Sequence, residues 1–134
     1  MTNHEELLKN LIEIKSYSGE EALLRGFIAR WFEQRNIASF AQEDNLVVWL
    51  EGKDTTRAFI FNSHMDTVSS GSQPWEYGPW NPQKVEDKII GLGASDMKGG
   101  LAASMLLAEE TAASGEIPVD MWFTYVVHEE TDGS

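Results

Sequence analysis

The first part of the chain repeats apolar residues with the period of an α-helix. Leucine and isoleucine recur at three- and four-residue spacing across residues 5–14, among Glu, Lys and Asn, which predicts an amphipathic helix. A second apolar stripe over residues 23–32 predicts another helix that ends near Asn36. Ser18 and Glu21 precede this stripe with the spacing of a capping box, so we expect Ser18 to cap the second helix.

Further along, the helical period gives way to short apolar runs. Residues 46–50 and 57–61 predict two strands joined by a turn, and residues 119–127 form the strongest strand signal of the chain. Because residues 58–61 are almost continuously apolar, we expect a central strand buried on both faces. A further helix is predicted from Leu101 onward. Strands and helices therefore alternate, as in an α/β fold.

Two segments between these elements are rich in residues that break regular structure. Residues 69–82 contain three of the four prolines and predict a long loop, and residues 85–90 predict a short hairpin. Residues 91–100 contain four glycines, which indicates unusual backbone angles or a close backbone approach. The dinucleotide fingerprint would need glycine where Asp96 stands, and the phosphate-loop and nucleophile-elbow patterns also fail. With these motifs excluded, the segment offers one carboxylate, Asp96, in a glycine-rich loop at the start of a predicted helix.

Composition narrows the class of protein. At 134 residues, with 42% hydrophobic and 24% charged residues, the chain has the length and balance of one globular unit. It has no cysteine, so any metal must be held by His, Asp and Glu. Its 22 acidic and 10 basic residues give a net charge of −12, which argues against nucleic acid and anionic membranes as partners. No apolar segment has the length of a membrane span, so we expect a cytoplasmic protein.

Three polar clusters stand at predicted strand ends or at a helix start. His64 and Asp66 follow the second predicted strand, and their i, i+2 spacing lets both side chains converge on one object. By itself this pair fits a solvated pair at a capped strand end, or a metal ligand with its orienting carboxylate. Asp96 precedes a helix, and Glu129 and Glu130 follow the last strand. In an alternating chain all three clusters meet at one edge of the sheet, where α/β sites are built.

The clusters extend into three longer motifs. They are Ser63-His64-Met65-Asp66-Thr67-Val68, Gly91-x-Gly93-Ala94-x-Asp96-Met97-Lys98-Gly99-Gly100, and Glu129-Glu130. In order and spacing, along essentially the whole chain, this set resembles the di-zinc aminoacylases and carboxypeptidases, a family that includes acetylornithine deacetylase, succinyl-diaminopimelate desuccinylase and glutamate carboxypeptidase. One departure is Leu92, where the family commonly has arginine.

The resemblance implies a fold and a domain organisation. The expected fold is α/β of the zinc-exopeptidase type, a three-layer mixed sheet with helices on both faces, here truncated. Residues 1–134 would be the N-terminal part of the metallohydrolase catalytic domain, without its C-terminal part and without the lid and dimerisation domain. A full-length form would then be a homodimer. The resemblance also implies a cis peptide bond after Asp96.

The resemblance further implies roles for five side chains. His64 would bind one zinc ion, Asp96 would bridge two, and Glu130 would bind the other. Asp66 would orient His64, and Glu129 would be the general base. The cofactors implied are two divalent metal ions, with zinc first and cobalt or manganese as substitutes, because sites of His and carboxylates accept all three.

The implied activity is hydrolysis of the amide bond of an N-acyl amino acid, by a deacetylase or desuccinylase, or of a small peptide. The substrate would thus be a small molecule. With Asp96 shared, the segment supplies two ligands per ion, whereas a catalytic zinc takes three protein ligands. We therefore expect this segment to be inactive alone. The alternative is a non-catalytic binding module, or a decayed homologue that keeps the fold.

Overall fold

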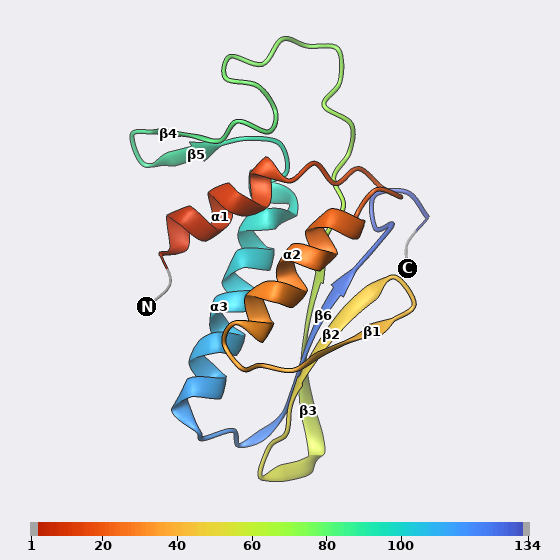
Figure 1. The fold of residues 1–134 in the computed structure, drawn as a ribbon, viewed down its shortest axis with the longest axis vertical. Helices are drawn as coiled ribbons and strands as arrows, with labels where there is room; N and C mark the ends of the chain where they lie inside the picture. Colours follow the sequence, from red (N-terminus) through yellow and green to blue (C-terminus); the bar gives the residue numbers. More distant parts are fainter. Residues whose placement is uncertain (1–2, 133–134) are drawn as a thin grey trace.

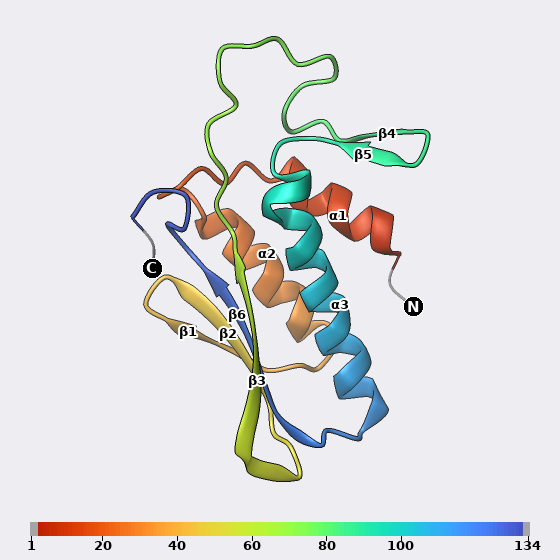
Figure 2. The same cartoon turned by 180° about the vertical axis from the view of Figure 1, so that it is seen from behind.

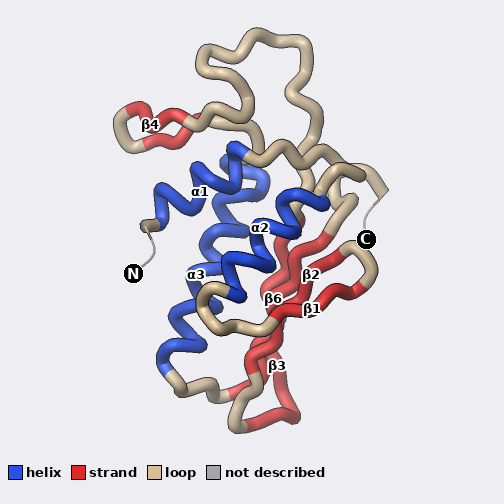
Figure 3. The backbone as a smooth tube through the Cα atoms, viewed as in Figure 1, coloured by secondary structure: helices blue, strands red, loops and turns tan. Residues whose placement is uncertain are grey.

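Three α-helices pack against a four-stranded sheet in the part of the chain that the computed structural model describes, residues 3–132 (Figure 1). Figure 3 colours the same backbone by secondary structure. In chain order the elements are α1 (His4–Glu13), α2 (Ala22–Glu33), β1 (Ser39–Gln42), β2 (Asn45–Leu50), β3 (Asp54–His64), β4 (Gln83–Val85), β5 (Lys88–Ile90), the π-helical turn η1 (Ala94–Lys98), α3 (Gly99–Ser114) and β6 (Val119–Val126).

The sheet is mixed and has the strand order β1-β2-β6-β3. β1, β2 and β6 pair antiparallel, whereas β3 and β6 run parallel, and α3 lies in the connection between them. In this register His64 lies opposite Val126, so the two parallel strands end together. The residues that follow β3 and β6 therefore start from adjacent points on one edge of the sheet.

The helices cover one face of the sheet and form the core with it, as two opposite views show (Figures 1 and 2). Phe123 and Tyr125 of β6 point toward the helices and are fully buried, together with Ile28 of α2 and Met105 of α3. The mixed α/β architecture confirms the predicted fold class. Among residues 3–132 the helices cover one face of the sheet, whereas helices on both faces were expected. None of these helices is long and apolar enough to cross a membrane.

The opposite face of the sheet carries exposed apolar side chains. Trp49 of β2 stacks on Trp122 of β6, with ring centroids 5.5 Å apart and an interplanar angle of 17°. Phe40 of β1 packs edge-on against the same indole. Ile60 of β3, paired in register with Trp122, is 68% exposed. We call these four side chains the open apolar face.

The expectation that residues 58–61 form a strand buried on both faces was wrong. β3 lies at the edge of the sheet as residues 3–132 form it, and its paired neighbour there is β6 alone. Phe59 and Ile60 are consequently exposed. An apolar run indicates that a strand can be buried, but the number of its neighbours is set by residues far away in the sequence.

The predicted capping box is the second difference. α2 begins at Ala22, with Glu21 in the N-cap position and without a side-chain cap bond. The Ser18 hydroxyl instead donates to the Asp66 carboxylate at 2.6 Å. Glu21 accepts the backbone amide of His128, so both residues that we assigned to a helix cap contact other parts of the molecule.

The remaining predicted elements are confirmed. Residues 69–82 are irregular and project beyond the sheet edge, and residues 83–90 form the hairpin of β4 and β5 (Figure 1). Trp80 holds the loop to the body of the molecule through Tyr17, with ring centroids 5.9 Å apart. The short strand β1 was not predicted.

Candidate metal centre

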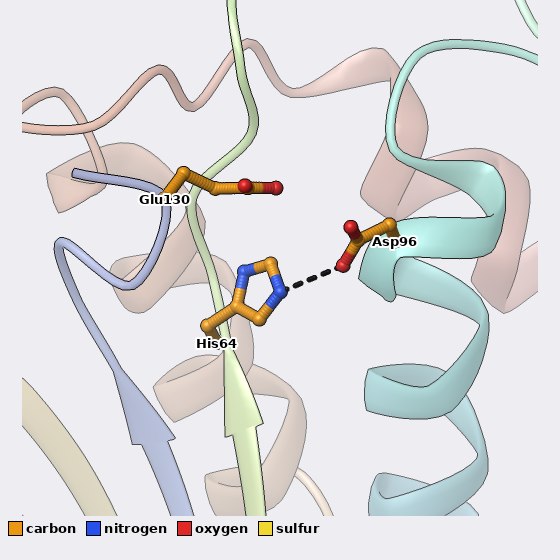
Figure 4. A group of neighbouring side chains, drawn as sticks. All are labelled: His64, Asp96 and Glu130. Atoms are coloured by element: carbon orange, nitrogen blue, oxygen red, sulfur yellow. Dashed lines mark hydrogen bonds and ion pairs between the residues drawn. The ribbon is translucent and has the colours of Figure 1, made fainter. Parts of the chain in front are cut away.

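Three side chains meet at the edge where β3 and β6 end (Figure 4). His64 is the last residue of β3, Asp96 lies in η1 before α3, and Glu130 lies in the loop after β6. One ligand atom from each lies within 4.8 Å of the other two. The Nε2 atom of His64 is 2.9 Å from Oδ1 of Asp96. The fold thus brings together three residues that are far apart in the sequence.

The second ring nitrogen of His64, Nδ1, fixes the orientation of the imidazole. The side chain is 6% exposed, and its Nδ1 hydrogen-bonds to the backbone carbonyl of Asp66 at 2.9 Å. The Asp66 carboxylate lies 3.4 Å from the same Nδ1. Burial alone would lower the pKa of His64, but the hydrogen bonds to Asp96 and to the Asp66 carbonyl outweigh it and raise that pKa. The Nε2 atom is left facing the cluster.

Asp66 contacts the loop that carries the two glutamates. Its carboxylate accepts the backbone N–H of Glu129 at 3.1 Å and that of Glu130 at 3.0 Å, besides the Ser18 hydroxyl. Burial alone would raise the pKa of Asp66, but these three hydrogen bonds outweigh it, and the pKa lies below its usual value. Asp66 is therefore ionised and buried. It holds the loop that carries the two glutamates, in addition to contacting His64 as the sequence led us to expect.

Glu129 lies beside the cluster and is more exposed than His64. Its Oε2 is 3.6 Å from Nε2 of His64. Burial and the neighbouring Asp96 carboxylate raise the pKa of Glu130. Three carboxylates thus converge on one imidazole, an arrangement of like charges that a bound cation would neutralise.

The donor set fits a divalent transition metal. Imidazole nitrogen and carboxylate oxygen are ligands that zinc, cobalt and manganese accept. A metal ion would replace the direct His64–Asp96 contact, because both use the same Nε2 atom. The Asp96 side chain is 74% exposed and can adjust to it.

The turn η1, which carries Asp96, is fixed to α1 by a buried lysine. Lys98 is 1% exposed, and its ammonium donates to the carbonyl oxygens of Leu11 at 2.7 Å and Ile14 at 2.6 Å, at the end of α1. Gly93 opens the turn with a φ of 76°. The peptide bond after Asp96 is cis, as the resemblance implied. The sequence signal for Lys98 was a single cation within a glycine-rich segment, too little to indicate this contact.

A depression of about 270 Å³ lies next to the cluster. Asp96 and Glu130 form part of its wall, and Val68 and Leu92 contribute apolar surface. A small molecule bound there would contact the metal-ligating groups and an apolar surface at once.

Comparison with known proteins now gives the family. The family described as peptidase family M20/M25/M40 matches residues 60–134, more than half of the chain. The chain belongs to peptidase family M20/M25/M40. The family predicted from the three motifs is thereby confirmed, and proteins named succinyl-diaminopimelate desuccinylase are among its relatives.

Individual M20 proteins match most of this chain. An M20 domain-containing protein of Schizosaccharomyces pombe is 30% identical over 137 residues, which cover 95% of this chain and 32% of that protein. Succinyl-diaminopimelate desuccinylase of Psychromonas ingrahamii is 32% identical over 109 residues, 78% of this chain and 28% of that protein. The crystal structure of an M20 metallo-carboxypeptidase from Sulfolobus solfataricus superimposes with a TM-score of 0.83 at 19% identity, over 97% of this chain and 32% of that one. This M20 chain spans about a third of the length of its relatives.

Proposed function

We propose that this M20 chain carries metal-binding and proton-transfer groups of a hydrolase that cleaves the amide bond of an N-acyl amino acid or a small peptide. The observation that carries the proposal is the meeting of His64, Asp96 and Glu130 within 4.8 Å, at the edge where two parallel strands end. The relatives named as a desuccinylase and a metallo-carboxypeptidase support the same class of reaction.

Asp96 would bridge two divalent ions, with His64 on one and Glu130 on the other. Such ions supply Lewis-acid activation of water and of the scissile carbonyl. Zinc is the first candidate, because its common ligands are imidazole and carboxylate. The Nδ1 contact with Asp66 supports the assignment of His64, since a ligating histidine is usually oriented through its second ring nitrogen.

Glu129 would be the general base. It lies 3.6 Å from His64 but outside the group of three ligands, and its exposed carboxylate can reach a water molecule at the cluster. It would accept a proton from the attacking water and deliver it to the leaving nitrogen, a role that typically accelerates a reaction about 10²–10⁴-fold.

The residues described here would hold metal weakly by themselves. Two ligands per ion are fewer than the three protein ligands usual for catalytic zinc. We therefore propose that this segment alone has little or no activity. Its substrate would be small, because the depression beside the cluster has a volume of about 270 Å³.

The decisive experiment separates Glu129 from Glu130, two adjacent carboxylates with different proposed roles. Zinc affinity is measured by titration calorimetry on this chain. Release of amine from N-acetylornithine and N-succinyl-diaminopimelate is measured on the protein at its natural length. Glu129→Gln should keep zinc affinity within about threefold and lower the rate about 10²–10⁴-fold. Glu130→Gln should lower both.

An unchanged rate in Glu129→Gln would contradict the role of general base. Absence of zinc, cobalt and manganese binding by the protein at its natural length would contradict the hydrolase itself, and would favour a non-catalytic module with the M20 fold.

A further inference from the structure

Four consecutive backbone amides after β6 are all bound by side chains from other segments. They belong to residues 127–130, which we call the 127–130 loop. The first amide donates to Oδ1 of Asn45 at 3.0 Å and the second to Oε1 of Glu21 at 3.1 Å. The third and fourth donate to the Asp66 carboxylate. Side chains from three separate parts of the chain thus determine the path of this loop.

The second of these amides belongs to the residue with the least common backbone conformation in the loop. His128 has a φ of 60°, in the left-handed region that a non-glycine residue occupies at a cost. This turn of the backbone directly precedes Glu129 and Glu130. A hydrogen bond that fixes the His128 amide therefore sets the direction of both glutamates.

Glu21 is an unusual residue to find in this position. It is 4% exposed, and burying a carboxylate costs free energy unless hydrogen bonds compensate for the lost water. It stands at the N-cap of α2 without capping the helix through its side chain. Its side-chain contact runs instead to the loop of the metal centre, 107 residues away in the sequence.

We propose that Glu21 is a positioning residue of the metal centre. By accepting the His128 amide, it holds the 127–130 loop in the one conformation that aims Glu129 and Glu130 at His64. Asp66 fixes the far end of the loop, and Glu21 fixes the turn that precedes it. This inference rests on the proposed function for its consequence, and on the hydrogen bonds alone for its structural part.

The test compares Glu21→Leu, which removes the acceptor, with Glu21→Gln, which keeps an acceptor oxygen at the same position. The first readout is hydrogen exchange of the loop amides, followed by NMR on this chain without metal. The second is zinc affinity by titration calorimetry. Glu21→Leu should speed exchange of the His128 amide at least tenfold and weaken zinc binding about 10–100-fold, the usual effect of losing a group that orients ligands. Glu21→Gln should restore both to within about threefold of the wild type.

Glu20→Leu is the matched control. Glu20 is the adjacent residue, its side chain is 58% exposed, and its ion pair with Lys15 is a surface contact. The same substitution there should change neither readout. Equal exchange and equal zinc affinity in Glu21→Leu and the wild type would overturn the proposal, as would failure of Glu21→Gln to restore them.

If Glu21→Leu does not fold, Glu21→Asp retains the charge but withdraws the acceptor by one methylene, and it should accelerate exchange of the His128 amide in the same direction. If the wild-type chain binds zinc too weakly to measure, zinc affinity is measured on the protein at its natural length, where absence of binding would contradict the proposed function. The exchange of the loop amides in this chain still decides the role of Glu21.

Discussion

Asp66 joins three segments through a single carboxylate. It accepts the Ser18 hydroxyl and two amides of the 127–130 loop, and its backbone carbonyl holds the imidazole of His64. Three hydrogen-bond donors favour the ionised form of this buried carboxylate. The geometry of the metal centre is thus tied to the charge of a residue that is not itself among the three converging ligands.

The first prediction concerns Asp66→Asn in the presence of a chelator. Because the pKa of Asp66 is lowered in the folded state, its contribution to stability is present above the unfolded pKa of about 3.9 and is lost as pH falls through the folded value. The substitution should lower the free energy of unfolding by about 1–3 kcal/mol at pH 7. The difference from the wild type should close below about pH 4.

Urea unfolding followed by circular dichroism at several pH values measures this difference. Asp44→Asn is the matched control, because Asp44 is 79% exposed and pairs with Arg25 at the surface. A gap between Asp66→Asn and the wild type that does not change with pH would contradict the prediction.

At the scale of single residues, the sequence was sufficient to predict which motif residues meet at the site. The meeting of His64, Asp96 and the Glu129-Glu130 pair could be predicted because strand ends and helix starts in an alternating chain lie at one edge. The choice of Glu130 as the ligand came from the family resemblance and stays a prediction. The contacts of Glu21 and Lys98 could not. Each joins segments more than 80 residues apart, and no local pattern distinguishes a buried anchor of this kind from a helix cap or a surface cation.

At the scale of elements, the turn η1 is bound to the end of α1. The Lys98 ammonium lies among the last carbonyl oxygens of that helix, where a cation is favoured by the helix dipole as well as by hydrogen bonds. The position of Asp96 is therefore coupled to α1, an element that contributes no residue to the cluster. Displacement of α1 would move the turn.

The second prediction follows from the burial of this ammonium. Burial lowers the pKa of Lys98 to about 8. In the unfolded chain the same amine has a pKa near 10.4, so between about pH 8 and 10 the unfolded state binds more protons. The Lys98 contribution should therefore make stability rise with pH in this window, by at most about 1.4 kcal/mol per pH unit. Lys98→Met should lack that contribution.

Urea unfolding at pH 8, 9 and 10 measures the difference between the two proteins, in which all other titrating groups cancel. Lys88→Met, a substitution of an exposed lysine in β5, should keep the wild-type rise. Parallel pH profiles for Lys98→Met and the wild type would show that this ammonium titrates as it does in water.

The elements themselves differ in how well the sequence predicts them. α1 and β6 carry long periodic or apolar runs, and both were predicted within a few residues. β1 has only four residues, most of them exposed, and is a strand because β2 offers it a paired edge. The sequence placed the N-cap of α2 at Ser18, because Ser18 and Glu21 have the spacing of a capping box. In the structure both side chains bind residues that are distant in the sequence, so neither caps the helix.

At the scale of the whole molecule, the open apolar face stands out against a strongly acidic chain. Ile60 and Trp49 are exposed on it, and β3 presents an unpaired edge beside them among the described strands. Exposed apolar edge strands promote association between chains. The net charge of −12 opposes that association, and the opposition weakens as salt screens it.

The third prediction is that Ile60→Lys reduces self-association of this chain at high salt. Burying an isoleucine contributes about 1.5–3 kcal/mol, so the association constant should fall roughly 10–100-fold, as measured by sedimentation velocity. Because Ile60 is 68% exposed, the free energy of unfolding should stay within about 0.5 kcal/mol. Ala103→Lys, on the exposed side of α3, adds the same side chain elsewhere and should leave association unchanged. A monomeric wild type at all concentrations would contradict the prediction.

The sequence predicted the α/β class and the edge at which the site lies, because both depend on the order of the elements. It did not predict the open apolar face. The apolar run in β3 does not determine which face of the strand is covered or how many strands pair with it. Both depend on the arrangement of the whole sheet.

The stacked indoles of Trp49 and Trp122 give this face an optical signature of its own. Two indoles stacked at this distance, with ring planes inclined by 17°, couple their electronic transitions. We expect this coupling to give a paired band in the circular dichroism spectrum that is lost when β2 and β6 separate. Trp49 is 42% exposed, so its fluorescence also responds to the polarity of its surroundings. A molecule that covers the open apolar face should shift the emission of Trp49 to shorter wavelength, and Trp49→Phe identifies its share of the signal among the five tryptophans.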